Sequence, residues 1–157
     1  MKKRLNMMVG PPSDKSRDGE AAELFLKAAD DHVVCGGITS RIVSAYLDKE
    51  LELEAEYFQD KLMSYGYIGS VIATEGVVTL NAIADYYEGV KEIPSEGSGA
   101  RKIMELFDGA DLITVIFGTC VNEEHEGDLA FENKQKSLYK IKSKLEGLGK
   151  EVEIINF

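Results

Sequence analysis

The stretch from residue 33 to residue 43 constrains the fold of this chain most strongly. A run of valines and a cysteine leads into Gly36 and Gly37, and a helical pattern with Thr39 and Ser40 near its start follows. An unbroken apolar run of this length is typical of a strand covered on both faces of a parallel sheet. Glycines allow the tight turn that aims the first N–H groups of a helix at an anion. We therefore expect a strand, a glycine turn and a helix that together form a binding site.

Strand-like and helix-like segments alternate along the rest of the chain. We expect strands at 5–9, 32–35, 51–55, 71–73, 111–117 and 151–155, and helices at 19–29, 39–47, 77–87, 99–107 and 134–148. Residues 57–70 show no clean period and are predicted as a loop, as is the long polar segment 118–133. This order predicts an α/β three-layer sandwich of the Rossmann-like type, with a mainly parallel sheet of about five or six strands and helices on both faces.

Length and charge limit the classes of function. A chain of 157 residues is predicted to form a single α/β domain over residues 1–157. The net charge of −10 argues against a general nucleic-acid or anionic-membrane binder, because both need clustered cations. Only two cysteines occur, and no apolar run approaches the length of a signal peptide or a membrane span. We expect a cytoplasmic protein that binds neither nucleic acid nor membranes.

Four polar loops are expected at the carboxyl ends of the strands, where ligands bind in open α/β sheets. The predicted ligand-binding residues in these loops are Gly10, Pro11, Asp14, Lys15, Cys35, Gly36, Gly37, Thr39, Ser40, Thr74, Glu75, Gly76, Gly118, Asn122 and His125. The glycine turn matches neither the G-x-G-x-x-G dinucleotide motif nor the P-loop motif G-x-x-x-x-G-K-[ST]. The plainer interpretation is a tight strand-to-helix turn with a hydroxyl cap.

Other reactive residues have two interpretations each. Cys35 could be a nucleophile activated by the following helix, or a small buried apolar residue. His32, three residues earlier on the strand, should point to the opposite face, which leaves His125 as the histidine that could act as its base. His125 and its neighbouring glutamates lack a second histidine at ligand spacing, so no metal site is predicted. The lysines at 134, 136, 140, 142 and 144 are predicted to form a solvated helix face.

Three of these segments together resemble a known family. The segments are Met8 to Lys15 with Asp18, Val33 to Gly37 with Thr39, and Thr74 to Gly76 with Thr79 and Leu80. They resemble the region C-terminal to the catalytic domain in bacterial serine phosphatases of the stage II sporulation protein E type. The similarity spans about residues 3 to 120, with Asn122 and His125 as a weaker continuation. Ile38 stands where the family usually has a first threonine, and no segment of this chain matches the phosphatase domain that carries the metal-binding aspartates.

The resemblance implies an accessory module rather than a phosphatase. The predicted function is a regulatory or ligand-binding domain, similar to that of a bacterial serine/threonine phosphatase, that binds a small anionic or nucleotide-like molecule. Its expected partners beyond that ligand are a phosphatase domain or a second copy of the chain. One alternative is a small transferase or hydrolase that uses Cys35 or Thr39 with His125, and another is a protein-interaction module. Neither catalytic residues nor a cofactor are predicted.

Overall fold

The computed structural model describes residues 2–53, 56–121 and 127–157, with side chains from residue 131 onward in the last range. It contains one seven-stranded sheet in the order β3-β4-β5-β2-β1-β6-β7. The strands are β1 (Arg4–Val9), β2 (Asp31–Cys35), β3 (Leu51–Glu52), β4 (Gly66–Ile68), β5 (Val71–Thr74), β6 (Leu112–Phe117) and β7 (Glu151–Asn156). All neighbours from β5 to β7 pair in parallel, whereas β3–β4 and β4–β5 are antiparallel.

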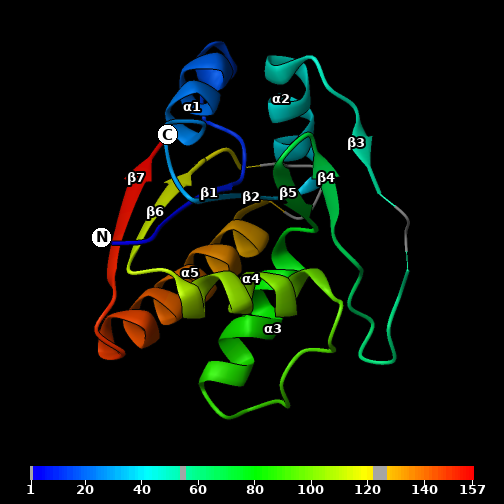
Figure 1. Ribbon diagram of the computed structural model, residues 1–157, viewed down its shortest axis with the longest axis vertical. Helices are drawn as coiled ribbons and strands as arrows, with labels where there is room; N and C mark the ends of the chain where they lie inside the picture. Colours follow the sequence, from blue (N-terminus) through cyan, green and yellow to red (C-terminus); the bar gives the residue numbers. More distant parts are fainter. Residues whose placement is uncertain (1, 54–55, 122–126) are drawn as a thin grey trace.

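Helices cover both faces of the sheet, which confirms the predicted three-layer sandwich (Figure 1). They are the short 3-10 helix η1 (Lys15–Arg17), α1 (Asp18–Phe25), α2 (Gly37–Leu47), α3 (Val77–Tyr87), α4 (Gly99–Gly109) and α5 (Gly127–Gly147). In Figure 1, α1 and α2 lie above the sheet, and α3, α4 and α5 lie below it.

The central strands bury side chains on both faces, as their unbroken apolar sequences predict. On β1, Met7 and Val9 belong to the core between the sheet and helices α3, α4 and α5. Met8 belongs to the core between the sheet and helices α1 and α2. On β2, the ring of His32 contacts that of Phe25 on α1 at 5.6 Å between centroids. Cys35 lies in the opposite core, so the prediction that His32 and Cys35 face opposite sides is confirmed.

Two segments predicted as loops contain regular structure. Residues 66–68 form β4, which pairs with β5 across a turn at Gly69, where φ is +61°. This strand is too short for a clear sequence period. The last helix begins at residue 127, seven residues before the predicted start, so the expected loop 118–133 was too long. Phe131 lies seven residues before buried Leu138, which extends the apolar stripe of α5 by two turns.

The start of α1 also differs from the prediction. Asp18 is the first helical residue, one residue before the predicted start, and Arg17 occupies the cap position without a side-chain hydrogen bond. Asp14 instead caps η1, because its carboxylate accepts a hydrogen bond from the backbone N–H of Ser16 at 2.9 Å.

The strand order reverses direction at β1. The chain moves outward from β1 through β2 to β5, then returns to place β6 and β7 on the other side of β1. The carboxyl ends of β1 and β6 therefore flank a topological switch point, the place where open α/β sheets bind ligands.

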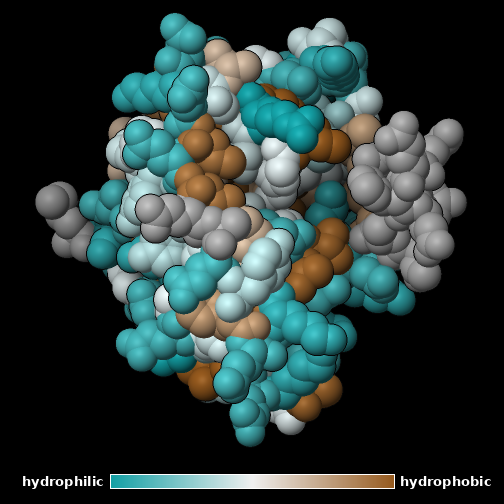
Figure 2. Space-filling model, turned by 90° about the vertical axis from the view of Figure 1, so that its right-hand side faces the viewer, coloured by the Kyte–Doolittle hydropathy of each residue, from teal (hydrophilic) through white to brown (hydrophobic). Residues whose placement is uncertain are grey.

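The described residues beside β3 and β4 present several separate apolar patches. Figure 2 shows separate apolar patches divided by hydrophilic side chains. Exposed apolar residues of β3, β4 and the segments next to them include Leu51, Leu53, Tyr57 and Tyr67. Among the helices of the described ranges, none combines the length and the apolar character needed to span a bilayer.

Candidate functional site

A cleft of about 470 Å³ opens at the carboxyl ends of β1, β2 and β5, beside the residues that follow β6. Glycine turns form much of its surface, and α2, α3 and α5 contribute side chains. Its lining residues are Gly10, Pro11, Cys35, Gly36, Gly37, Ile38, Thr39, Arg41, Glu75, Gly76, Val77, Cys120, Phe131 and Lys134. The cleft is within the usual range of about 300–1,000 Å³ for small-molecule sites.

The start of α2 is built by a glycine that another residue could not replace without strain. Gly36 has φ of +112° and ψ of 146°, a conformation open to glycine, and its N–H donates to the carbonyl of Thr74 at 2.9 Å. The N–H of Ser40 makes the first helical bond, to the carbonyl of Gly36. No side chain caps this helix, and no described residue accepts from the N–H groups of residues 37–39. These groups give the cleft a partial positive charge.

The start of α3 lies directly beside that of α2. A Cβ atom placed on Gly76 would lie 3.3 Å from the Cα of Gly36, so the two turns touch. The carboxylate of Glu75 accepts a hydrogen bond from the N–H of Thr79 at 3.3 Å. The negative charge of Glu75 is therefore directed in part at the start of α3, where it stabilises the helix.

Lys134 of α5 brings a half-buried cation to the cleft. Its Nζ lies 5.8 Å from the centroid of the Phe117 ring and 5.9 Å from that of Phe131. Burial lowers the pKa of Lys134 from its usual value. No hydrogen bond or ion pair joins its ammonium group to any residue that the structure describes. Lys134 is thus a partly dehydrated cation whose neighbours are aromatic rings rather than carboxylates.

Arg41 supplies a second cation from the exposed surface of α2. It lies one turn after the glycine turn, on the same helix whose first N–H groups face no described acceptor. Among its described lining residues, the cleft therefore combines Arg41, Lys134 and the positive end of α2 with one carboxylate, that of Glu75.

Two glycines make room at the base of this arrangement. Gly10 has φ of +80°, and a Cβ on it would lie 2.7 Å from the Nζ of Lys134. A Cβ on Gly118 would lie 2.2 Å from the carbonyl oxygens of Gly10 and Pro11. The N–H of Gly118 donates to the carbonyl of Val9 at 2.8 Å, which continues the pairing of β1 and β6 beyond the strands. The absence of both side chains lets the two loops pack together at the switch point.

Cys35 lies at the cleft but is not activated. It is almost fully buried, and burial raises the pKa of its thiol to about 12. The hydroxyl of Thr74 lies 3.3 Å from its Sγ and 3.1 Å from the carbonyl oxygen of Val34. Cys35 therefore stays protonated at neutral pH, which fits the small buried residue rather than the nucleophile.

The structure brings eight of the predicted ligand-binding residues into this one cleft: Gly10, Pro11, Cys35, Gly36, Gly37, Thr39, Glu75 and Gly76. Gly118 packs against the loop that lines it, whereas Ser40 and Thr74 are buried and do not line it. Asp14 and Lys15 belong to the exposed η1 turn and do not line it either. Asn122 and His125 lie outside the described residues.

Six lining residues were not predicted as ligand contacts: Ile38, Arg41, Val77, Cys120, Phe131 and Lys134. Lys134 was wrongly predicted as part of a solvated helix face. Its position between Phe131 and Leu138 was the available indication, since residues at these spacings share one side of a helix.

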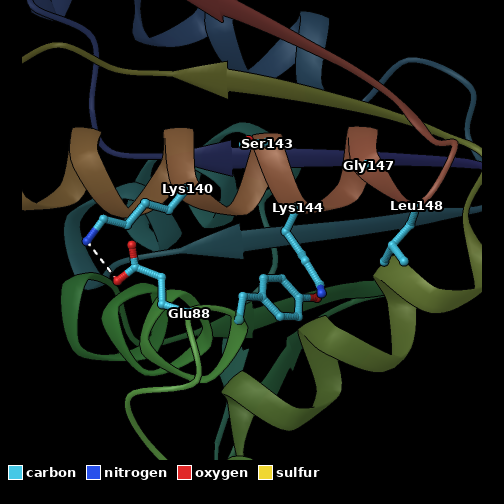
Figure 3. Close-up of a pocket in the computed structure, with 7 residues that line it drawn as sticks. Glu88, Lys140, Ser143, Lys144, Gly147 and Leu148 are labelled. Atoms are coloured by element: carbon cyan, nitrogen blue, oxygen red, sulfur yellow. Dashed lines mark hydrogen bonds and ion pairs between the residues drawn. The ribbon is translucent and has the colours of Figure 1, made fainter.

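Two other hollows have different chemistry. One, of about 420 Å³, lies at the C-terminal ends of α3 and α5, where Lys140 and Glu88 approach across it to form an ion pair at 3.2 Å (Figure 3). Burial raises the pKa of Tyr87 in that hollow to about 12, so its hydroxyl stays neutral. The other, of about 810 Å³, is lined by Asp60, Asp85 and Glu92 among others. Neither contains a predicted site residue.

Within the described ranges, no three His, Cys, Asp or Glu residues are grouped so that they could hold a metal ion. Comparisons of the chain with protein-family models, with curated proteins and with solved structures gave no significant match.

Proposed function

We propose that this chain is a ligand-binding domain that holds a small anionic molecule, nucleotide-like molecules included, in the cleft beside Gly36 and Gly37. The observation that carries the proposal is the uncapped start of α2, which shares this cleft with two cationic side chains. Unpaired N–H groups at a helix start and nearby cations attract the same kind of ligand. The position of the cleft at the strand ends next to the switch point supports it further.

The buried, protonated thiol of Cys35 disfavours a covalent mechanism at this residue. A regulatory role next to a phosphatase domain stays a prediction from the sequence resemblance. Binding by itself needs neither a nucleophile nor a base, so the cleft is sufficient for the proposed role.

The test is Gly37→Val, which places a side chain on the surface of the cleft. A Cβ on Gly37 meets no other atom within 4 Å, so the variant should fold. Gly19→Val is the matched control, because Gly19 is also helical, also has open space around its Cβ and lies outside the cleft. Thermal-shift screening of anionic metabolites against the wild type would be followed by calorimetric titration of the hits.

The expected result is that hits bind the wild type and Gly19→Val alike and bind Gly37→Val at least tenfold more weakly. Equal binding to all three proteins would place the site elsewhere. An anionic library without a single hit would contradict the proposed function itself.

A further inference from the structure

We infer that the ligand carries one anionic group, a carboxylate or a phosphate monoester, on an apolar body, and that Lys134 contacts this group. The inference rests on the proposed function and specifies its ligand. It concerns the side of the cleft formed by α5, from which no ligand contact was predicted.

The charges that line the cleft suit a single anionic group. Among the described residues that line the cleft, Lys134 and Arg41 bring two positive charges, and Glu75 brings one negative charge. A nucleoside diphosphate carries about three negative charges, one more than the two cations supply. The carboxylate of Glu75 would repel this excess. A single carboxylate or phosphate is matched by Lys134 and the start of α2 without that excess.

The walls of the cleft are largely apolar. Pro11, Ile38, Val77 and Phe131 all line it, each from a different element or loop. Ile38 is 46% exposed although it stands in the first turn of α2, beside the N–H groups that face no described acceptor. A ligand that covered Ile38 would remove apolar surface from water, which contributes roughly 25 cal/mol per Å².

The surroundings of Lys134 place the anion contact on its ammonium group. The rings of Phe117 and Phe131 both lie within 6 Å of its Nζ, and they pack against each other with centroids 5.7 Å apart. The flexible stem of the lysine lies against Gly10, where a missing side chain leaves room for Nζ. An ammonium group that is already partly dehydrated loses little further hydration when it meets an anion, so the contact is stronger than on an open surface.

The experiment compares matched probes on the full chain. Indole-3-acetate and phenyl phosphate represent the two anionic groups on an apolar body, and indole-3-acetamide is the neutral counterpart of the first. Inorganic phosphate tests the anion without a body, and ADP tests the polyphosphate. Each is titrated by calorimetry against the wild type, Lys134→Met and Lys136→Met. Lys136 is an exposed lysine of the same helix outside the cleft, so its variant is the matched control.

We expect at least one of the two apolar anions to bind more tightly than phosphate, ADP and indole-3-acetamide. Lys134→Met should weaken that binding by roughly 10- to 100-fold, the usual effect of losing a charged hydrogen bond, and Lys136→Met should not change it. Lys134→Met replaces the lysine with an apolar side chain of similar length, so circular dichroism should show an intact fold.

Three results would overturn the inference. They are tighter binding of ADP or phosphate than of both apolar anions, equal binding of indole-3-acetate and its amide, and unchanged binding by Lys134→Met. If ADP binds best and Gly37→Val abolishes its binding, the proposed anion site stands and only the ligand class is wrong. If none of the four anions binds, this inference is wrong, and the library screen described above decides separately whether the proposed function stands.

Discussion

Gly118→Ala should destabilise the fold by about 2 kcal/mol, although it adds a single methyl group. The new Cβ would lie 2.2 Å from the carbonyl oxygens of Gly10 and Pro11, where ordinary contacts begin at 3.4 Å. The loop after β1 would therefore have to move by about 1 Å, and hydrogen bonds from Gly118 to Val9 and from Cys120 to Pro11 hold it in place. Overpacking of this kind costs about 1–3 kcal/mol, with the upper end expected against backbone atoms. The smaller conformational freedom of alanine in the unfolded chain returns about 0.4–1 kcal/mol.

The assay is urea unfolding followed by circular dichroism, with Gly147→Ala as the control. A Cβ on Gly147, the last residue of α5, meets no atom within 4 Å, so the same substitution there should be neutral or slightly stabilising. For a chain of this size, 2 kcal/mol lowers Tm by about 4–8 °C. A Gly118→Ala variant as stable as Gly147→Ala would refute the close approach of the two loops and with it the described base of the cleft.

Two further predictions concern Cys35 and the cap of α4. Because burial raises the pKa of its thiol to about 12, Cys35 should hold far less thiolate at neutral pH than an exposed cysteine. Iodoacetamide at pH 7.5 should therefore modify the partly exposed Cys120 well before the buried Cys35, as read by mass spectrometry; equal rates at that pH would contradict the burial of Cys35. Ser98→Ala should lower the free energy of unfolding by about 1 kcal/mol, because the fully buried Ser98 hydroxyl accepts from the N–H of Arg101 at 3.1 Å and caps α4. Denaturant unfolding checks this value, and no loss of stability would mean that the cap is dispensable.

The sequence predicts the layers of this fold well because its central strands have unambiguous patterns. The apolar run of β6 and the helical spacing of α3 place both elements within one residue of their observed bounds. The predictions fail where tertiary contacts decide the structure. β4 has only three residues and is stabilised by its hydrogen bonds to β5. The first turns of α5 depend on Phe131, which packs against Phe117.

In the candidate site, too, residues set by local sequence patterns could be predicted, and residues placed by tertiary contacts could not. Residues of the strand-to-helix turns, such as Gly36 and Gly76, are accessible to sequence analysis, because parallel strands end at a common edge. Lys134 is not, since it reaches the cleft from a helix whose start was predicted seven residues too late. The spacing of Lys134 from Phe131 indicates a shared side of the helix, but the sequence does not show that the ring of Phe117, on β6, lies there too.

If the proposed anion binds in the cleft, the half-buried ammonium of Lys134 would make the stability of the protein depend on that ligand. Burying a charge costs free energy in the empty protein, and an anion that binds the folded state alone would offset that cost. At a ligand concentration one hundred times the Kd, such linkage adds about 2.7 kcal/mol to the free energy of unfolding. The fraction of chains that is folded, and so protected from proteases, would then rise and fall with the supply of the ligand.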